Sequence, residues 1–171
     1  MGVDFGKRRD HSAIAICERS DEPGFAIRHL EQVGLGTRYT AIADHLTALS
    51  KRLGHPKMLV DESGVGVAVI EMLIERGLSP IGVTMTGGES ARYDTEQNRW
   101  VASKEALLTP LEVAMRDGSV RVASGLPAAA ALKRELGAFA RKGVKMEATK
   151  GHDDLVIAVA LAVFGLVVAP S

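Results

Sequence analysis

The stretch Gly2-Val3-Asp4-Phe5-Gly6 decides how this chain can fold, because it places one acidic residue inside an apolar segment. Its apolar side chains predict a buried strand around Asp4. The charged segment 7–11 separates it from a second apolar run, residues 12–17, so the two segments predict a β-hairpin. Residues 25–33 partly alternate between apolar and polar side chains. The chain is therefore expected to begin with a three-stranded antiparallel meander.

The rest of the sequence predicts helices alternating with strands. Apolar side chains recur at helical spacing in several segments, and the last of these begins near His152. Residues 85–98 hold two glycines and many polar side chains and predict a mobile loop, before a helix capped by Ser103. Helices are predicted at residues 39–53, 65–76, 103–117, 127–140 and from 152 onward, strands at 57–61, 80–84 and 120–123, and a small hairpin at 142–149.

Together these elements predict one α/β domain over residues 1–171, with a mixed sheet of five or slightly more strands and helices on both faces. A length of 171 residues with 46% apolar content allows one buried core. The lone Cys17 excludes an intramolecular disulfide and favours a cytoplasmic location, and the start of the chain does not resemble a signal peptide. The apolar segment 155–169 is shorter than the ~20 residues of a membrane span, so we expect no membrane association.

Acidic residues occur at three distant points, each beside an apolar segment. Asp4 lies in the first predicted strand, Asp61 ends the fourth, and Asp153 and Asp154 begin the last helix. If the first and fourth strands are neighbours, these carboxylates meet at one end of the sheet. Clustered carboxylates are costly unless they bind cations, and divalent cations prefer oxygen ligands. The sequence therefore predicts a site for two divalent cations that hydrolyses a phosphodiester.

Each acidic residue also has a structural interpretation. Asp4 could end a strand at a turn, and Asp61 could cap the following helix, with Glu62 as the ligand if the strand register shifts by one. Asp153 and Asp154 could complement the dipole of the last helix. Asp154 is the stronger candidate ligand because the buried helix face follows it directly, whereas Asp153 could bind the second ion or position water.

Basic residues near the acidic sites are candidates for DNA contacts. The 21 basic and 21 acidic side chains give no net charge, but residues 141–150 contain four basic residues and one acidic residue. This local excess suits a phosphate backbone, although a solvated hairpin would also carry it. A cation at the start of a helix opposes the helix dipole, which favours a phosphate contact for Lys104. The candidates are Lys104, Lys142, Lys145, Lys150 and His152, of which His152 could equally be a helix cap.

The order and spacing of these motifs resembles the ribonuclease H-like nuclease superfamily, and most closely the C-terminal nuclease domain of tailed-phage large terminase subunits. The resemblance covers nearly the whole chain. It rests on Val3-Asp4-Phe5-Gly6 with the strand after it, on residues 60–66, on Ser103-Lys104-Glu105, and on Gly151-His152-Asp153-Asp154 before an alanine-rich helix.

The resemblance implies a mechanism, cofactors and partners. Asp4 would bridge two Mg²⁺ or Mn²⁺ ions, Asp61 would hold one, and Asp154, with or without Asp153, the other. The domain would cut concatemeric viral DNA during genome packaging, with low sequence specificity. Implied partners are double-stranded DNA, an ATPase motor domain, the portal and the small terminase subunit, in the host cytoplasm. The sequence itself contains no Gly-x-x-x-x-Gly-Lys-Ser/Thr phosphate loop.

Three other interpretations remain open from the sequence. A Holliday-junction resolvase of the same superfamily would also carry paired acids on its closing helix and would prefer four-way junctions. A sugar kinase of the actin-like fold resembles the first motif, but 171 residues are too few for its second domain. A non-catalytic packaging module of the same fold would tolerate loss of Asp4, Asp61 and Asp154.

Overall fold

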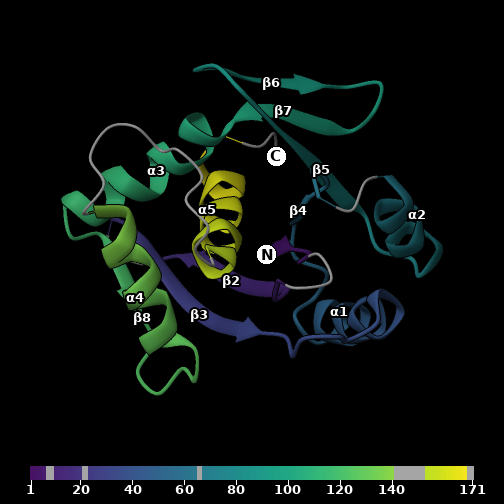
Figure 1. Cartoon of the computed structure of the whole chain (residues 1–171), viewed down its shortest axis with the longest axis horizontal. Helices are drawn as coiled ribbons and strands as arrows, with labels where there is room; N and C mark the ends of the chain where they lie inside the picture. Colours follow the sequence, from purple (N-terminus) through teal and green to yellow (C-terminus); the bar gives the residue numbers. More distant parts are fainter. Residues whose placement is uncertain (7–9, 21–22, 65–66, 141–152, 169–171) are drawn as a thin grey trace.

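The computed structural model describes residues 1–6, 10–20, 23–64, 67–140 and 153–168. They form one mixed eight-stranded sheet with five helices packed against it (Figure 1). In chain order the elements are β1 (Gly2–Asp4), β2 (Ala13–Arg19), β3 (Phe25–Gln32), α1 (Tyr39–Arg52), β4 (Met58–Asp61), α2 (Val67–Glu75), β5 (Pro80–Thr86), β6 (Ala91–Asp94), β7 (Arg99–Ser103), α3 (Lys104–Arg116), β8 (Val120–Val122), α4 (Ala129–Ala140) and α5 (Asp154–Val167).

The sheet has the strand order β6-β7-β5-β4-β1-β2-β3-β8. Strands β1, β2 and β3 form the predicted antiparallel meander. On its other side β1 pairs in parallel with β4, and β4 pairs in parallel with β5. The condition that the sequence left open is therefore met, because the first and fourth strands are direct neighbours at the centre of the sheet.

The sheet is larger than predicted because residues 85–98 do not form the expected loop. Part of this segment is β6, which pairs antiparallel with β7 and extends the sheet. The turn between them explains the polar composition, since the carboxylate of Asp94 accepts hydrogen bonds from two turn amides and Asn98 has a φ of 48°. The strand is stabilised by distant packing, with the rings of Tyr93 and Trp100 5.3 Å apart and Trp100 against Phe164.

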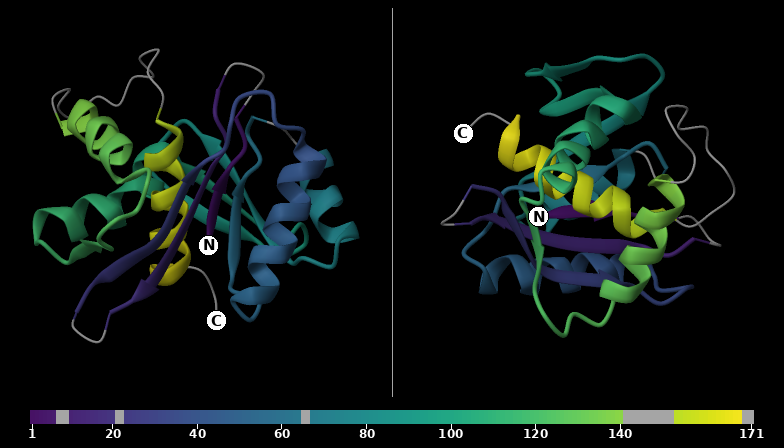
Figure 2. Two further views of the ribbon diagram at one scale, coloured as in Figure 1. Left: turned by 90° about the horizontal axis from the view of Figure 1, so that it is seen from below. Right: turned by 90° about the vertical axis from the view of Figure 1, so that its left-hand side faces the viewer.

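Helices cover both faces of the sheet, as predicted. Figure 2 shows α3, α4 and α5 on one face and α1 and α2 on the other. Two apolar clusters fill these layers, one between the sheet and α5 with its neighbours, and one beneath α1 and α2. None of the helices in the described part of the chain is long and apolar enough to cross a membrane.

Helix α5 lies unusually close to the centre of the sheet. It is buried from Asp154 to Gly165. A Cβ atom added to Gly2 would lie 2.6 Å from the backbone nitrogen of Ala162 and closer still to the carbonyl oxygen of Ala158. Glycine on β1 therefore allows the helix and strand backbones to approach to a distance that no side chain would permit.

A polar cluster joins α1 to β3 on the opposite face. The carboxylate of Glu31 lies 2.9 Å from Nε2 of His45 and 3.1 Å from Nε2 of His29. Partial burial would raise the pKa of Glu31, but the hydrogen bonds from His45 and His29 hold it below its ordinary value of 4.5. The cluster therefore links the helix to the sheet while Glu31 is ionised.

We expect Glu31→Gln to lower the melting temperature by about 1–3 °C near pH 6 and by less near pH 3.5. Because the folded-state pKa lies below 4.5, the contribution of this carboxylate is present above that pH and is lost as the pH falls through the folded value. Thermal denaturation across this range checks the prediction. Glu75→Gln, at an exposed position on α2, controls for the loss of one charge. A loss of melting temperature in Glu31→Gln that is the same at every pH would contradict the prediction.

Candidate active site

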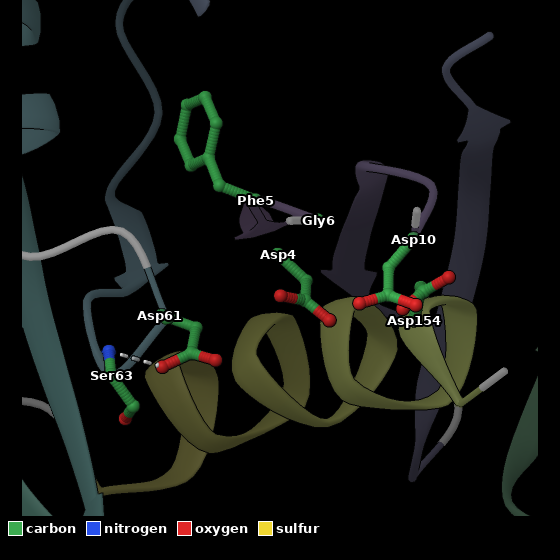
Figure 3. A pocket seen from close by; sticks show the side chains of 8 residues that line it. Asp4, Phe5, Gly6, Asp10, Asp61, Ser63 and Asp154 are labelled. Carbon is green, nitrogen blue, oxygen red and sulfur yellow. Dashed lines mark hydrogen bonds between the residues drawn. The ribbon is translucent and has the colours of Figure 1, made fainter. Parts of the chain in front are cut away.

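The pairing of β1 with β4 brings two predicted site residues together. These strands are parallel and in register, with Asp4 directly opposite Asp61. Both carboxylates therefore lie at the same end of the sheet. Asp154, in the first turn of α5, faces the same space, and the side chains converge on a pocket of about 280 Å³ (Figure 3). The pocket is lined by Asp4, Phe5, Gly6, Asp10, Asp61, Ser63, Gly64 and Asp154.

The electrostatics of this pocket favour a bound cation. Burial raises the pKa of Asp4 well above its ordinary value, and the charges of Asp61, Asp154 and Asp153 raise it further. Burial also raises the pKa of Asp61, although hydrogen bonds from Ser63 oppose the shift. A cation would relieve this repulsion, and the carboxylate oxygens suit a hard divalent ion.

Asp61 and Glu62 point to different surroundings, and the role of either one as a metal ligand stays a prediction. Oδ1 of Asp61 accepts a hydrogen bond of 2.8 Å from the backbone nitrogen of Ser63, within the turn after β4. Glu62 instead accepts hydrogen bonds from Thr84 and, at 2.9 Å, from Nη1 of Arg99. Asp61 therefore belongs to the pocket and does not cap α2, whose described part begins at Val67. Glu62 is held by β5 and β7.

This chain is similar to a known protein family over nearly its whole length. Residues 1–165 match the family model described as the terminase RNaseH-like domain. The chain belongs to this family. The match confirms the family and the fold class predicted from the sequence.

Relatives with the same domain agree with this assignment. The terminase large subunit of Thermus phage G20c is 29% identical to this chain over 164 residues. The alignment covers 95% of this chain but only 30% of that protein. The crystal structure of the large terminase nuclease from thermophilic phage G20c has a TM-score of 0.68 at 29% identity, and the alignment covers 94% of this chain and 78% of that one. The human cytomegalovirus terminase nuclease domain, Mn-soaked with an inhibitor bound, has a TM-score of 0.60 at 13% identity, covering 96% and 81%, and shows the fold alone.

In this terminase RNaseH-like domain, Asp153 and Lys104 form an ion pair at the edge of the pocket. Nζ of Lys104 donates a hydrogen bond of 2.5 Å to Oδ2 of Asp153. The lysine is held at the start of α3, where the side chain of Ser103 caps the helix as predicted. The structure therefore places Lys104 beside the acidic cluster, where it offsets the negative charge, and its predicted contact with DNA stays a prediction.

Two acidic residues of the site were missed by the sequence reasoning. Asp10 lies in the charged segment that joins β1 to β2, and its carboxylate points into the pocket (Figure 3). The hairpin prediction could have revealed it, since that connection lies at the end of the sheet where Asp4 is found. Glu135, on α4, is the second, and its contact with α5 depends on tertiary packing.

The environment of Glu135 is unusual for an acidic side chain. Its Oε2 accepts hydrogen bonds from the backbone nitrogens of Leu155 at 3.1 Å and Val156 at 3.2 Å. Burial raises the pKa of Glu135 to about 7, because the two hydrogen bonds do not fully offset burial and the nearby charges of Asp154 and Asp153.

The remaining candidates lie outside the described residues. These are Lys142, Lys145, Lys150 and His152, together with the predicted hairpin at residues 142–149. Their proposed contacts with DNA stay predictions. Within the described residues, no three acidic, histidine or cysteine side chains converge closely enough to hold a metal ion as they stand.

Proposed function

We propose that this domain is a metal-dependent endonuclease that cuts double-stranded DNA during viral genome packaging. The observation that carries the proposal is the placement of Asp4 and Asp61 on adjacent parallel strands, with Asp154 of α5 facing the same pocket. Family membership supports it. The G20c nuclease, which shares 26–29% identity with this chain, has been solved with bound magnesium, zinc and cobalt.

The side chains fit two divalent cations, Mg²⁺ or Mn²⁺, because the pocket offers buried carboxylate oxygens whose mutual repulsion Lys104 offsets only in part. Asp4 would contact both ions, Asp61 one of them, and Asp154 the other, with Asp153 as a further ligand or a support for water. Because no three described acidic side chains converge closely enough as they stand, these carboxylates would have to reorient to close the ligand set. Bound ions would supply an activated water and stabilise the charge that develops on the phosphate.

The residues around the acids would bind and orient the DNA backbone. Gly64 lines the pocket and carries no side chain to block a phosphate group. Lys104 offsets negative charge at the pocket edge through its pair with Asp153. Contacts of this kind recognise phosphate and not base sequence, so low sequence specificity is part of the proposal.

The partners of the domain are proposed from its family. The curated relatives are terminase large subunits, and this chain spans 30% of their length. We therefore propose that it acts with an ATPase motor domain, the portal and the small terminase subunit in the host cytoplasm.

Incubation of supercoiled plasmid with the chain in Mn²⁺, Mg²⁺ or EDTA tests the proposal. We expect nicking and linearisation in the presence of either ion, with complete loss in EDTA and in purified, folded Asp61→Ala. Equal cleavage by Asp61→Ala would exclude this pocket as the site. A preference for four-way junctions over linear duplex would favour a resolvase, and cleavage absent under every condition would favour an assembly module.

A further inference from the structure

The start of α5 is stabilised by a side chain from another helix. The first amides of an α-helix have no acceptor within the helix and need one from elsewhere. Asp153 occupies the N-cap position of α5 but makes no capping hydrogen bond, and its carboxylate pairs with Lys104 instead. Oε2 of Glu135, on α4, accepts from the amides of Leu155 and Val156.

This contact controls the direction of the neighbouring acids. Leu155 and Val156 follow Asp154 directly, so fixing their amides fixes the turn from which the Asp154 side chain leaves the helix. The same turn carries Asp153 at its start. The two hydrogen bonds from Glu135 therefore hold the geometry of the turn that carries Asp154.

We propose that Glu135 is a positioning residue that holds the first turn of α5 and thereby fixes the directions of the Asp153 and Asp154 carboxylates, of which Asp154 lines the pocket. The inference rests on the proposed function, since it assigns the aimed carboxylates to metal binding. Glu135 itself acts through α5 and touches neither ion nor DNA. Groups that support metal ligands in this way commonly change metal affinity about 10- to 100-fold when they are removed.

Three variants separate this role from others. Glu135→Ala removes the acceptor, Glu135→Gln keeps an oxygen that can accept both hydrogen bonds, and Glu112→Ala removes an acidic residue from an exposed position on α3. The measurements are the Mn²⁺ concentration that gives half-maximal plasmid cleavage, Mn²⁺ binding by calorimetry, and amide hydrogen exchange at residues 155 and 156.

We expect Glu135→Ala to raise the half-maximal Mn²⁺ concentration about tenfold or more and to weaken Mn²⁺ binding to the same degree. Its rate at saturating Mn²⁺ should change much less, and its amides at residues 155 and 156 should exchange faster. Glu135→Gln should stay within about twofold of the wild type in all measurements, as should Glu112→Ala, because neither removes a positioning contact.

Several results would overturn the inference. A lower melting temperature of Glu135→Ala with an unchanged Mn²⁺ requirement would leave only a structural role. If Glu135→Gln weakened Mn²⁺ binding as much as Glu135→Ala, the charge of Glu135 would be required and the hydrogen bonds alone would not explain its role. If the wild type binds Mn²⁺ without cutting DNA, the proposed function fails while calorimetry and exchange still decide the role of Glu135. Absence of Mn²⁺ binding in every form would reject both.

Discussion

Asp4→Asn is expected to abolish DNA cleavage and, in the same protein, to raise the melting temperature of the metal-free domain. The loss should be at least about 10³-fold, because contacts of a catalytic metal with its substrate contribute several kcal/mol to transition-state stabilisation. Asparagine has nearly the size of aspartate but carries no charge. The variant therefore removes the ligand while leaving the packing around β1 unchanged.

The gain in stability follows from the direction of the pKa shift. The pKa of Asp4 is raised by burial and then by Asp61, Asp154 and Asp153. The folded state therefore binds the Asp4 proton more tightly than the unfolded chain, and stability falls as the pH rises above the ordinary pKa of 3.8. At neutral pH, Asp4→Asn removes this cost, and we expect a rise in melting temperature of about 3 °C or more in EDTA.

Thermal denaturation in EDTA near pH 7 and near pH 5, beside plasmid cleavage in Mn²⁺, measures both effects. The stability gain should shrink at the lower pH, where wild-type Asp4 is more fully protonated. Asp44→Asn is the matched control, because it changes an exposed aspartate that pairs with Arg76 on the opposite face of the sheet. It should cut DNA normally. A destabilised Asp4→Asn protein, or one that still cleaves, would refute the assignment.

Gly2→Ala is expected to cause the largest loss of stability of any change considered for this chain. The added Cβ would meet backbone atoms of Ala158 and Ala162, which cannot rotate away as a side chain could. Either α5 or β1 must shift, and overpacking of this kind costs about 3 kcal/mol or more. For a domain of this size the melting temperature should fall by about 6–12 °C. Any protein that still folds should cut DNA poorly, since a shifted α5 carries Asp154 away from Asp4.

Urea denaturation of Gly2→Ala against the wild type measures the loss. Gly34→Ala is the matched control, because the Cβ added there would have its nearest neighbour, Oγ1 of Thr37, at an ordinary contact distance of 3.8 Å. We expect it to be close to the wild type. Equal stability of Gly2→Ala and Gly34→Ala would mean that α5 does not lie as close to β1 as described here.

Strands and helix caps that depend on neighbouring residues were predicted well. The apolar neighbours of Asp4 predicted its strand, the apolar run before Asp61 predicted the next one, and Ser103 was predicted as the cap of α3. These signals work because strand burial and helix capping are decided within a few residues. The order and spacing of several short motifs were sufficient to predict the family, and the pattern of strands and helices predicted the fold class.

Features that depend on distant contacts were not predicted. The segment containing Tyr93 was predicted to be a loop, because its turn residues dominate its composition while its pairing partner and the ring of Trp100 lie elsewhere. Nothing local to Glu135 indicates that two amides of α5 lie above it. The pair of Lys104 with Asp153 joins residues 49 positions apart. In each case a long-range contact, which no local pattern encodes, determines the role of the residue.

The parallel pairing of β1 with β4 fixes the distance between the backbones of two acidic residues of the site. Neighbouring strands are held about 4.8 Å apart by their peptide hydrogen bonds, so the spacing between the backbones at Asp4 and Asp61 is independent of the side chains around them. Asp154 has no such constraint, because it is carried by a helix whose position depends on Gly2. The backbones of Asp4 and Asp61 are therefore held at a fixed spacing, whereas Asp154 moves with any shift of α5. Under the proposed function, variation in ion preference or cutting rate between relatives should therefore arise in α5 and the residues that support it, and not in the central strands.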